Sequence, residues 1–279
     1  QQPSFLAAQR ELARRKGKDN TVTLFETQTT PTDIQIRNIA DSLSPSRFHS
    51  DFHALFDDLQ EEGFLEEYQK LTGTYHISLD GVTFHESTQI CCPNCNHRQD
   101  RAGQTHYYHN ALLAVISQPD SPHVLPLPPE CVVPQDGHDK QDCEQQAVKR
   151  WLAQHLPRFK PETVTFLGDD IYSRVPICRA MAEEYQQYFL FVCKPTSHKK
   201  LSETLHMLEE VGSVEHVRYE SWNATRRGYE VWHYRYVNEV PLTGDANALI
   251  LNWLDLTITD KQSGGLIFVN SWASNHYFS

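Results

Sequence analysis

The order of short apolar segments along the chain constrains the fold of this protein more than any other feature. Three strand-like runs follow one another closely after residue 73, and two more are separated by amphipathic segments of helical length. Hairpins connect antiparallel strands, whereas a crossover through a helix connects parallel ones. The order β-β-β-α-β-α-β therefore predicts an α/β protein whose mixed sheet carries helices on its faces. The expected strands cover residues 74–84, 106–117, 124–128, 164–167 and 188–193.

Polar residues at the starts of the two expected core helices are candidate N-caps. Asp139 or Asp142 can cap the first helix, which reaches about Leu156. Ser173 can cap the second, which has Pro176 in its first turn. Both helices then cross between strands of the sheet.

Three regions follow from this pattern. Residues 1–73 form an N-terminal helical region, because apolar residues recur at helical spacing up to the helix-breaking Gly63. Residues 74–212 form the α/β core, which ends with a helix at about 199–211. Residues 213–279 form an antiparallel β-rich insertion, with expected strands at 214–222, 229–240, 248–259 and 266–272.

Composition narrows the setting and the partners. The chain carries 25 Lys and Arg against 36 Asp and Glu, a net charge of −11 that weighs against nucleic acid, although residues 10–19 form a local basic run. No apolar run approaches the roughly 18 to 20 residues of a membrane span, and no signal peptide opens the chain. Seven cysteines, an odd number with three of them clustered, favour a reduced, cytoplasmic setting over a disulfide framework.

Aspartates stand where two apolar strands are expected to end. Asp80 precedes Gly81, and Asp-Gly is also the pair preferred in a tight hairpin turn. Asp169 and Asp170 follow the strand at 164–167, where a turn or a helix cap explains them equally well. In a sheet of strand order 3-2-1-4-5 the first and fourth strands are neighbours, so Asp80 and Asp169 would project side by side. Two close carboxylates repel unless a cation compensates them, and their oxygen atoms suit Mg²⁺ or Mn²⁺.

Several stretches, taken in order, resemble the DDE transposases of bacterial insertion sequences, which have a ribonuclease-H-like catalytic core. The matching stretches are Leu79-Asp80-Gly81, Cys92-Pro93-Asn94-Cys95, His106-Tyr107-Tyr108-His109, residues 134–144 (PQDGHDKQDCE), Gly168-Asp169-Asp170-Ile171-Tyr172-Ser173 and Phe191-Val192-Cys193-Lys194-Pro195. The resemblance runs from about residue 20 to the end, and residues 134–144 and 168–173 are its most specific parts. It implies a ribonuclease-H-like mixed sheet in which Asp80 and Asp169 are the first two catalytic acids. Asp170 is a poorer candidate for the second acid.

The resemblance also implies an activity, which is metal-dependent cleavage at transposon ends followed by strand transfer into target DNA. Asp80 and Asp169 would hold Mg²⁺ or Mn²⁺ for this chemistry. The family's third acid is a glutamate on a helix after the β-rich insertion, in a Trp-Lys-Ile-Glu-Asn-type stretch, and residues 1–279 contain no such stretch. We therefore expect a C-terminally incomplete transposase that is inactive alone. Its partners would be DNA, as transposon ends and target, and further copies of the chain.

Two other functions are compatible with the sequence. The chain could be a non-catalytic DNA-binding or interaction remnant that modulates a full-length transposase, and specific DNA binding without cleavage would distinguish it. It could also be a metal-dependent nuclease whose third ligand lies elsewhere in the chain. Cleavage by such a nuclease would still depend on Asp80 and Asp169.

A cysteine cluster predicts a second, separate metal site. Two thiolates and two imidazoles, the ligand set of tetrahedral zinc, are offered by Cys92, Cys95, His106 and His109. The two histidines are closer in sequence than in a typical zinc finger, and Cys91 and His97 are competing ligands. A hairpin with buried free thiols explains the same residues without a metal. A bound zinc would be structural and would tie down the long connection between the first two strands.

Overall fold

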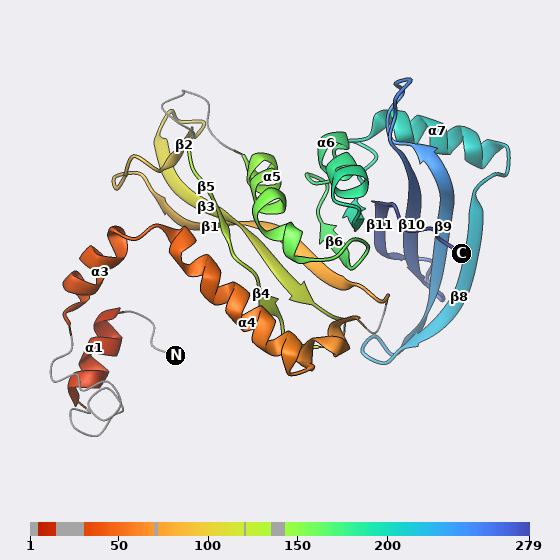
Figure 1. The fold of residues 1–279 in the computed structure, drawn as a ribbon. Helices are drawn as coiled ribbons and strands as arrows, with labels where there is room; N and C mark the ends of the chain where they lie inside the picture. Colours follow the sequence, from red (N-terminus) through yellow and green to blue (C-terminus); the bar gives the residue numbers. More distant parts are fainter. Residues whose placement is uncertain (1–4, 15–30, 70–71, 120, 135–142) are drawn as a thin grey trace. The chain divides into compact units, whose positions relative to one another are not determined.

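A computed structural model describes residues 5–14, 31–69, 72–119, 121–134 and 143–279 (Figure 1). The chain divides into two compact units, residues 1–50 and 51–279, and each is described by itself. No helix within the described ranges is long and apolar enough to cross a membrane. Asp139 and Asp142, the expected caps of the first core helix, lie outside the described residues.

The first unit contains the helices α1 (Phe5–Arg14) and α3 (Asp33–Asp41). α3 begins with a capping box. The backbone N–H of Gln35 donates to Thr32 Oγ1 at 3.2 Å, and the backbone N–H of Thr32 donates to Gln35 Oε1 at 2.9 Å. These two bonds satisfy amide donors that lack partners within the helix. The short helix η1 (Pro45–Phe48) follows, and α4 (His49–Glu61) starts at the boundary between the units.

In the second unit, α4 packs onto the hydrophobic core. The ring of Phe56 lies edge-on to the rings of Tyr75 and Phe159, at centroid distances of 5.9 and 5.2 Å. Gly63 has a φ of +77°, a conformation that ends a helix at little steric cost. This agrees with the helix break expected at Gly63, and the short helix η2 (Phe64–Gln69) follows.

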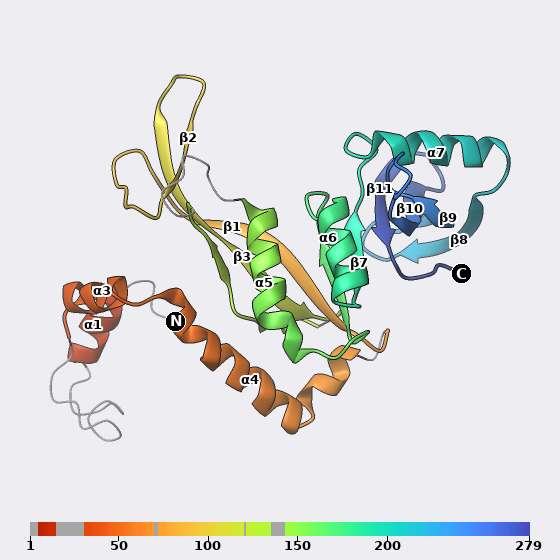
Figure 2. The ribbon, with the colours of Figure 1, turned by 45° about the horizontal axis from the view of Figure 1, so that its top comes forward.

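One mixed sheet of 11 strands runs through the described part of the second unit (Figure 2). Its first seven strands are β1 (Tyr75–Ser87), β2 (Asn96–Gln99), β3 (Thr105–Ser117), β4 (Leu125–Pro126), β5 (Glu130–Val132), β6 (Val164–Gly168) and β7 (Tyr188–Val192). Their order is β2-β3-β1-β6-β7, and β4 and β5 both pair with β3. β1 is antiparallel to β3 and parallel to β6, so the expected neighbours are adjacent. The mixed α/β class predicted from the sequence is confirmed.

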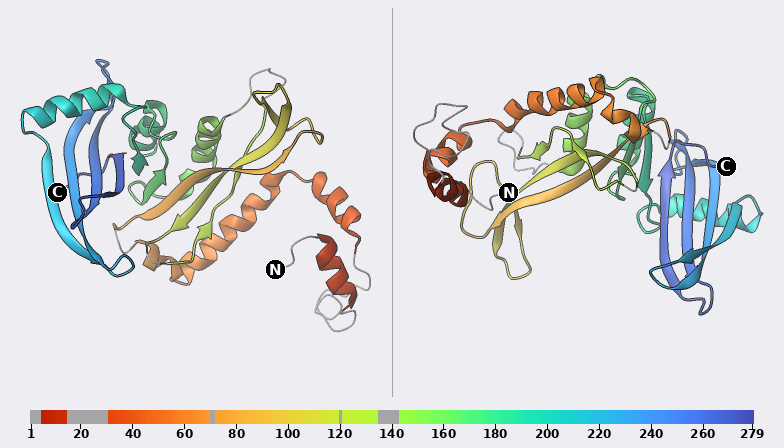
Figure 3. Two further views of the ribbon diagram at one scale, coloured as in Figure 1. Left: turned by 180° about the vertical axis from the view of Figure 1, so that it is seen from behind. Right: turned by 90° about the horizontal axis from the view of Figure 1, so that it is seen from below.

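The four C-terminal strands extend this sheet rather than forming a sheet of their own (Figure 3). They are β8 (Glu215–Asn223), β9 (Gly228–Pro241), β10 (Ile250–Asp260) and β11 (Leu266–Ser274). Each is antiparallel to the next, and β11 is antiparallel to β7. Two buried hydroxyls strengthen this junction, because Ser271 Oγ donates to the carbonyl of Cys193 and Ser274 Oγ donates to that of Phe189, each at 2.6 Å.

The helices of the core are α5 (Glu144–His155), η3 (Leu156–Arg158), α6 (Val175–Arg179), the π-helical turn η4 (Ala180–Glu184) and α7 (Lys199–Glu210). α5 buries Trp151 completely, with its ring edge-on to Phe166 and its indole N–H donating to the carbonyl of Pro128 at 2.8 Å. The expected cap of α6 is wrong, since Arg174 occupies the N-cap position. The Ser173 hydroxyl instead lies 2.8 Å from His198 Nε2 and donates to the carbonyl of Asp170.

Candidate functional site

Asp80 lies in β1, and Asp169 follows the end of β6 at the same level of these two neighbouring parallel strands. The register of β1 and β6 places Ser78 opposite Leu167, and each aspartate follows two residues later in its own segment. Paired residues of adjacent strands share a face, and this relation repeats every second residue. Both aspartates are exposed. The structure therefore brings together the two acids that the sequence analysis paired.

Asp80 is part of a strand and not of a hairpin turn. Asp80 and Gly81 lie inside β1, opposite Leu113 and Leu112 of β3, and form no hairpin turn. Asp169 does make a turn, because its Oδ1 accepts from the backbone N–H of Ile171 at 2.9 Å.

Asp170 has a structural role. Its Oδ1 accepts from the backbone N–H of Lys194 at 2.7 Å, and His198 Nε2 lies 3.8 Å from the same oxygen. These contacts tie the loop after β6 to the loop after β7.

Glu144 is a third carboxylate at this place, and the sequence analysis did not assign it a role. It is the first residue of α5, and its side chain lies over Gly81, where an added Cβ would be 2.3 Å from Glu144 Cδ. Tyr172 Oη donates to Glu144 Oε2 at 3.3 Å. Burial raises the pKa of Glu144, the Tyr172 hydrogen bond lowers it, and the charges of Asp169 and Asp80 raise it further. The three carboxylates therefore form one electrostatic group.

Tyr172 is the buried support of this group. Its side chain is 1% exposed and packs over Gly168, where an added Cβ would lie 2.5 Å from Tyr172 Cδ2. Burial, followed by the charges of Glu144, Asp169 and Asp80, raises its pKa, so the phenol keeps its proton and serves as a hydrogen-bond donor. The position of Glu144 thus depends on a tyrosine that the motif Gly168-Asp169-Asp170-Ile171-Tyr172 contains.

The donor chemistry of the acidic group fits a hard divalent cation. Mg²⁺ and Mn²⁺ take carboxylate oxygens, and Mg²⁺ keeps several waters when one or two carboxylates bind it. The carboxylates are spaced more widely than a closed metal cluster. A search of the described residues for three or more His, Cys, Asp or Glu side chains with all ligand atoms within 4.8 Å of one another finds one group. It consists of Cys92, Cys95 and His109.

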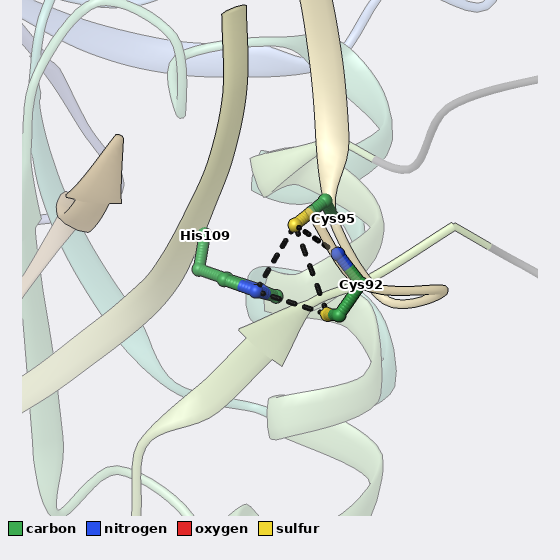
Figure 4. Close-up of side chains that lie close together, drawn as sticks. All are labelled: Cys92, Cys95 and His109. Atoms are coloured by element: carbon green, nitrogen blue, oxygen red, sulfur yellow. Dashed lines mark hydrogen bonds between the residues drawn. The ribbon is translucent and has the colours of Figure 1, made fainter. Parts of the chain in front are cut away.

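Those three side chains converge on one point between the turn before β2 and strand β3 (Figure 4). Cys92 Sγ and Cys95 Sγ are 3.7 Å apart, and each lies 3.3 Å from His109 Nε2. Burial raises the pKa of the Cys95 thiol, and burial together with the charge of His85 lowers the pKa of His109. Both shifts favour the uncharged forms, a protonated Cys95 thiol and a neutral His109 imidazole, in the absence of a metal.

His106, the fourth ligand proposed from the sequence, lies outside this cluster. Its Nδ1 is 2.8 Å from Glu86 Oε1 and its Nε2 is 3.3 Å from Asp100 Oδ2, so both ring nitrogens have other partners. Residues three apart on a strand point to opposite faces, which separates His106 from His109 on β3. Hydrogen bonds from Arg98 and then His106 lower the pKa of Glu86. His106 thus belongs to a group of surface ion pairs.

Comparisons with known proteins give no family assignment. No model of a protein family matches this chain, and no curated protein matches it.

Proposed function

We propose that this chain is a transposase-like enzyme of the DDE type, with a ribonuclease-H-like core that acts on DNA phosphodiesters. The observation that carries the proposal is the shared level of Asp80 and Asp169 on neighbouring parallel strands. The strand order β3-β1-β6-β7, with α5 preceding β6, supports it. The motif resemblance supplies the DNA substrate and the reaction class.

In this proposal the aspartates are metal ligands. A bound Mg²⁺ or Mn²⁺ polarises the phosphodiester and makes a bound water more acidic. Asp80 and Asp169 would hold the ion through their carboxylate oxygens, and the Oδ1 of Asp169 also accepts from the backbone N–H of Ile171. Asp170 keeps the loop that carries Asp169 in place through its bond to Lys194.

Glu144 favours a second candidate, a metal-dependent DNA nuclease. The transposase family takes its third acid from a later helix, whereas Glu144 reaches the other two carboxylates from α5. A site with three carboxylates from residues 80, 144 and 169 needs no further segment to bind the ion. The nuclease would stop after cleavage, while the transposase would also join a 3′-hydroxyl to target DNA.

The test measures metal binding and DNA cleavage separately. Mn²⁺ binding is titrated by electron paramagnetic resonance, and nicking of supercoiled DNA is followed with Mg²⁺ or Mn²⁺. We expect D80N and D169N to lose both properties. D170N is the matched control, because an asparagine oxygen can still accept from Lys194, and it should retain both.

Each result points to one function. Nicking that survives in D80N and D169N would reject the proposed site. Joined DNA products from the wild-type chain favour the transposase, and nicks alone that disappear in E144Q favour the nuclease. Sequence-specific DNA binding without Mn²⁺ binding would identify the non-catalytic remnant instead.

A further inference from the structure

The donor atoms of Cys92, Cys95 and His109 have the separations of a tetrahedral zinc site. With a Zn–S distance of about 2.3 Å and a Zn–N distance of about 2.0 Å, tetrahedral angles put two sulfurs about 3.8 Å apart and a sulfur and a nitrogen about 3.5 Å apart. The observed separations are 3.7 Å between the sulfurs and 3.3 Å from each sulfur to the imidazole nitrogen. One ion can therefore contact all three atoms without a rearrangement of the backbone.

Local structure explains why the two cysteines converge. Residues 92–95 form a turn in which the backbone N–H of Cys95 donates to the carbonyl of Cys92 at 3.1 Å. Pro93 occupies the second position of this turn, where its fixed φ is favourable. The backbone N–H of Cys92 donates to Cys95 Sγ at 3.2 Å. Such a donor stabilises a thiolate and orients it toward a metal.

The chemistry of the set selects the metal. Two thiolates and an imidazole form a nitrogen and sulfur set that suits zinc and is unsuited to Mg²⁺, which takes oxygen ligands. This separates the cluster from the carboxylates of Asp80, Asp169 and Glu144. The inference does not rest on the proposed function, because it uses none of those residues.

A fourth side chain stands beside the cluster. His85 of β1 is directly opposite His109 of β3 in the strand register, so the two imidazoles share a face of the sheet. Their ring centroids are 5.8 Å apart. A shift between Thr83 and His85 interrupts the register just before this pair, and such a bulge redirects side chains.

We propose that Cys92, Cys95 and His109 bind one Zn²⁺ and that His85 is the fourth ligand. The ion joins three segments, which are the far part of β1, the turn before β2, and β3. It therefore crosslinks the three-stranded part of the sheet in which the residues of β1 after Asp80 pair with β3, and β3 pairs with β2. A structural zinc of this kind contributes directly to the stability of the segments that it joins.

The experiment uses the full chain, purified without chelator. Zinc content is measured by mass spectrometry, and we expect one zinc per chain in the wild type. C92S, C95S and H109A should lose it. C91S and H106A are the matched controls, and both should keep one zinc per chain. The Cys91 thiol is not among the converging donor atoms, and both nitrogens of His106 contact other side chains.

A second measurement uses the wild-type chain, so that the test does not depend on whether the variants fold. Zinc is removed from the wild-type chain and replaced by Co²⁺, which should bind with tetrahedral absorption bands and thiolate charge-transfer bands. H85A should bind Zn²⁺ at least about tenfold more weakly. A wild-type chain without zinc that takes up no Co²⁺ overturns the site, as does loss of zinc in C91S or H106A. Unchanged affinity in H85A overturns the assignment of the fourth ligand.

Discussion

Strand β1 carries a residue of each candidate site, Asp80 and His85, yet the two sites are assembled differently. The cysteine-histidine cluster comes from one turn and the adjacent strand, and its donor atoms lie 3.3 to 3.7 Å apart. The acidic group comes from three elements distant in sequence, and its oxygens are spaced more widely. Neutral thiols and imidazoles can pack together without an ion, whereas carboxylates repel one another. Donor charge therefore limits how closely the side chains of a metal site can approach one another before the metal binds.

Removal of zinc should have the largest effect on stability. If free zinc is present at 1,000 times its Kd, the loss corresponds to about 4 kcal/mol. A strong zinc chelator should therefore lower the Tm of the wild type, as measured by circular dichroism. H106A should respond like the wild type, and H109A should not respond. If the chelator lowers the Tm of H109A as much as that of the wild type, the stabilising metal is not bound at the cysteine-histidine cluster.

Loss of one aspartate should affect catalysis without affecting the zinc site. We expect D80N and D169N to reduce metal-dependent nicking by about 10²- to 10³-fold, as when one preorganised electrostatic contact to a transition state is removed. Both variants should keep one zinc per chain. If D80N loses its zinc as well, the two sites are not independent.

Substitutions at two glycines test separately the support of the acidic group by Tyr172 and the carboxylate of Glu144. G168A should destabilise the chain by about 1–3 kcal/mol, because its Cβ would meet the ring of the buried Tyr172. G81A should change stability less, since its Cβ would meet the flexible end of Glu144, but it should weaken Mn²⁺ binding. G244A is the control, with its nearest atom at 3.7 Å. Chemical denaturation and Mn²⁺ titration measure the two effects, and equal destabilisation in G81A and G168A would contradict this separation.

Much of the core was predictable because its signals are local. The first part of β1 and the whole of β6 and β7 are short apolar runs, and the expected adjacency of the first and fourth strands placed Asp80 beside Asp169. β2 was missed because Asn96–Gln99 is a polar segment without an apolar pattern, and it becomes a strand through pairing with β3. The joining of β11 to β7 was also missed, because edge pairing between distant strands leaves no local pattern.

The candidate site residues show the same limit. His106 was assigned to zinc on spacing alone, although strand alternation separates it from His109. Ser173 was assigned as a cap, but His198 gives its hydroxyl a tertiary partner. Glu144 was missed because its role depends on where α5 begins relative to Gly81. The proximity of Asp80 and Asp169 could be predicted because it follows from the order of the strands. The contacts of Ser173 and Glu144 could not, because they depend on how helices and loops pack against the sheet.

The protonation state of Glu144 should have the smallest effect on the Tm, and its pH dependence tests directly whether Glu144 belongs to the acidic group. Burial and the two aspartate charges raise its pKa in the folded chain, so its charged form opposes folding at pH 7. In chelator, E144Q should therefore raise the Tm at pH 7, by less than G168A lowers it. As the pH falls through about 4.3, the ordinary pKa of an unfolded glutamate, the difference should shrink, and it should vanish once the glutamate is protonated in both states. E61Q, at an exposed position of α4, measures the general effect of removing a carboxylate. A Tm difference that stays constant between pH 4 and 7 would show that Glu144 is not held by burial beside Asp80 and Asp169, and the acidic group would then lose its third member.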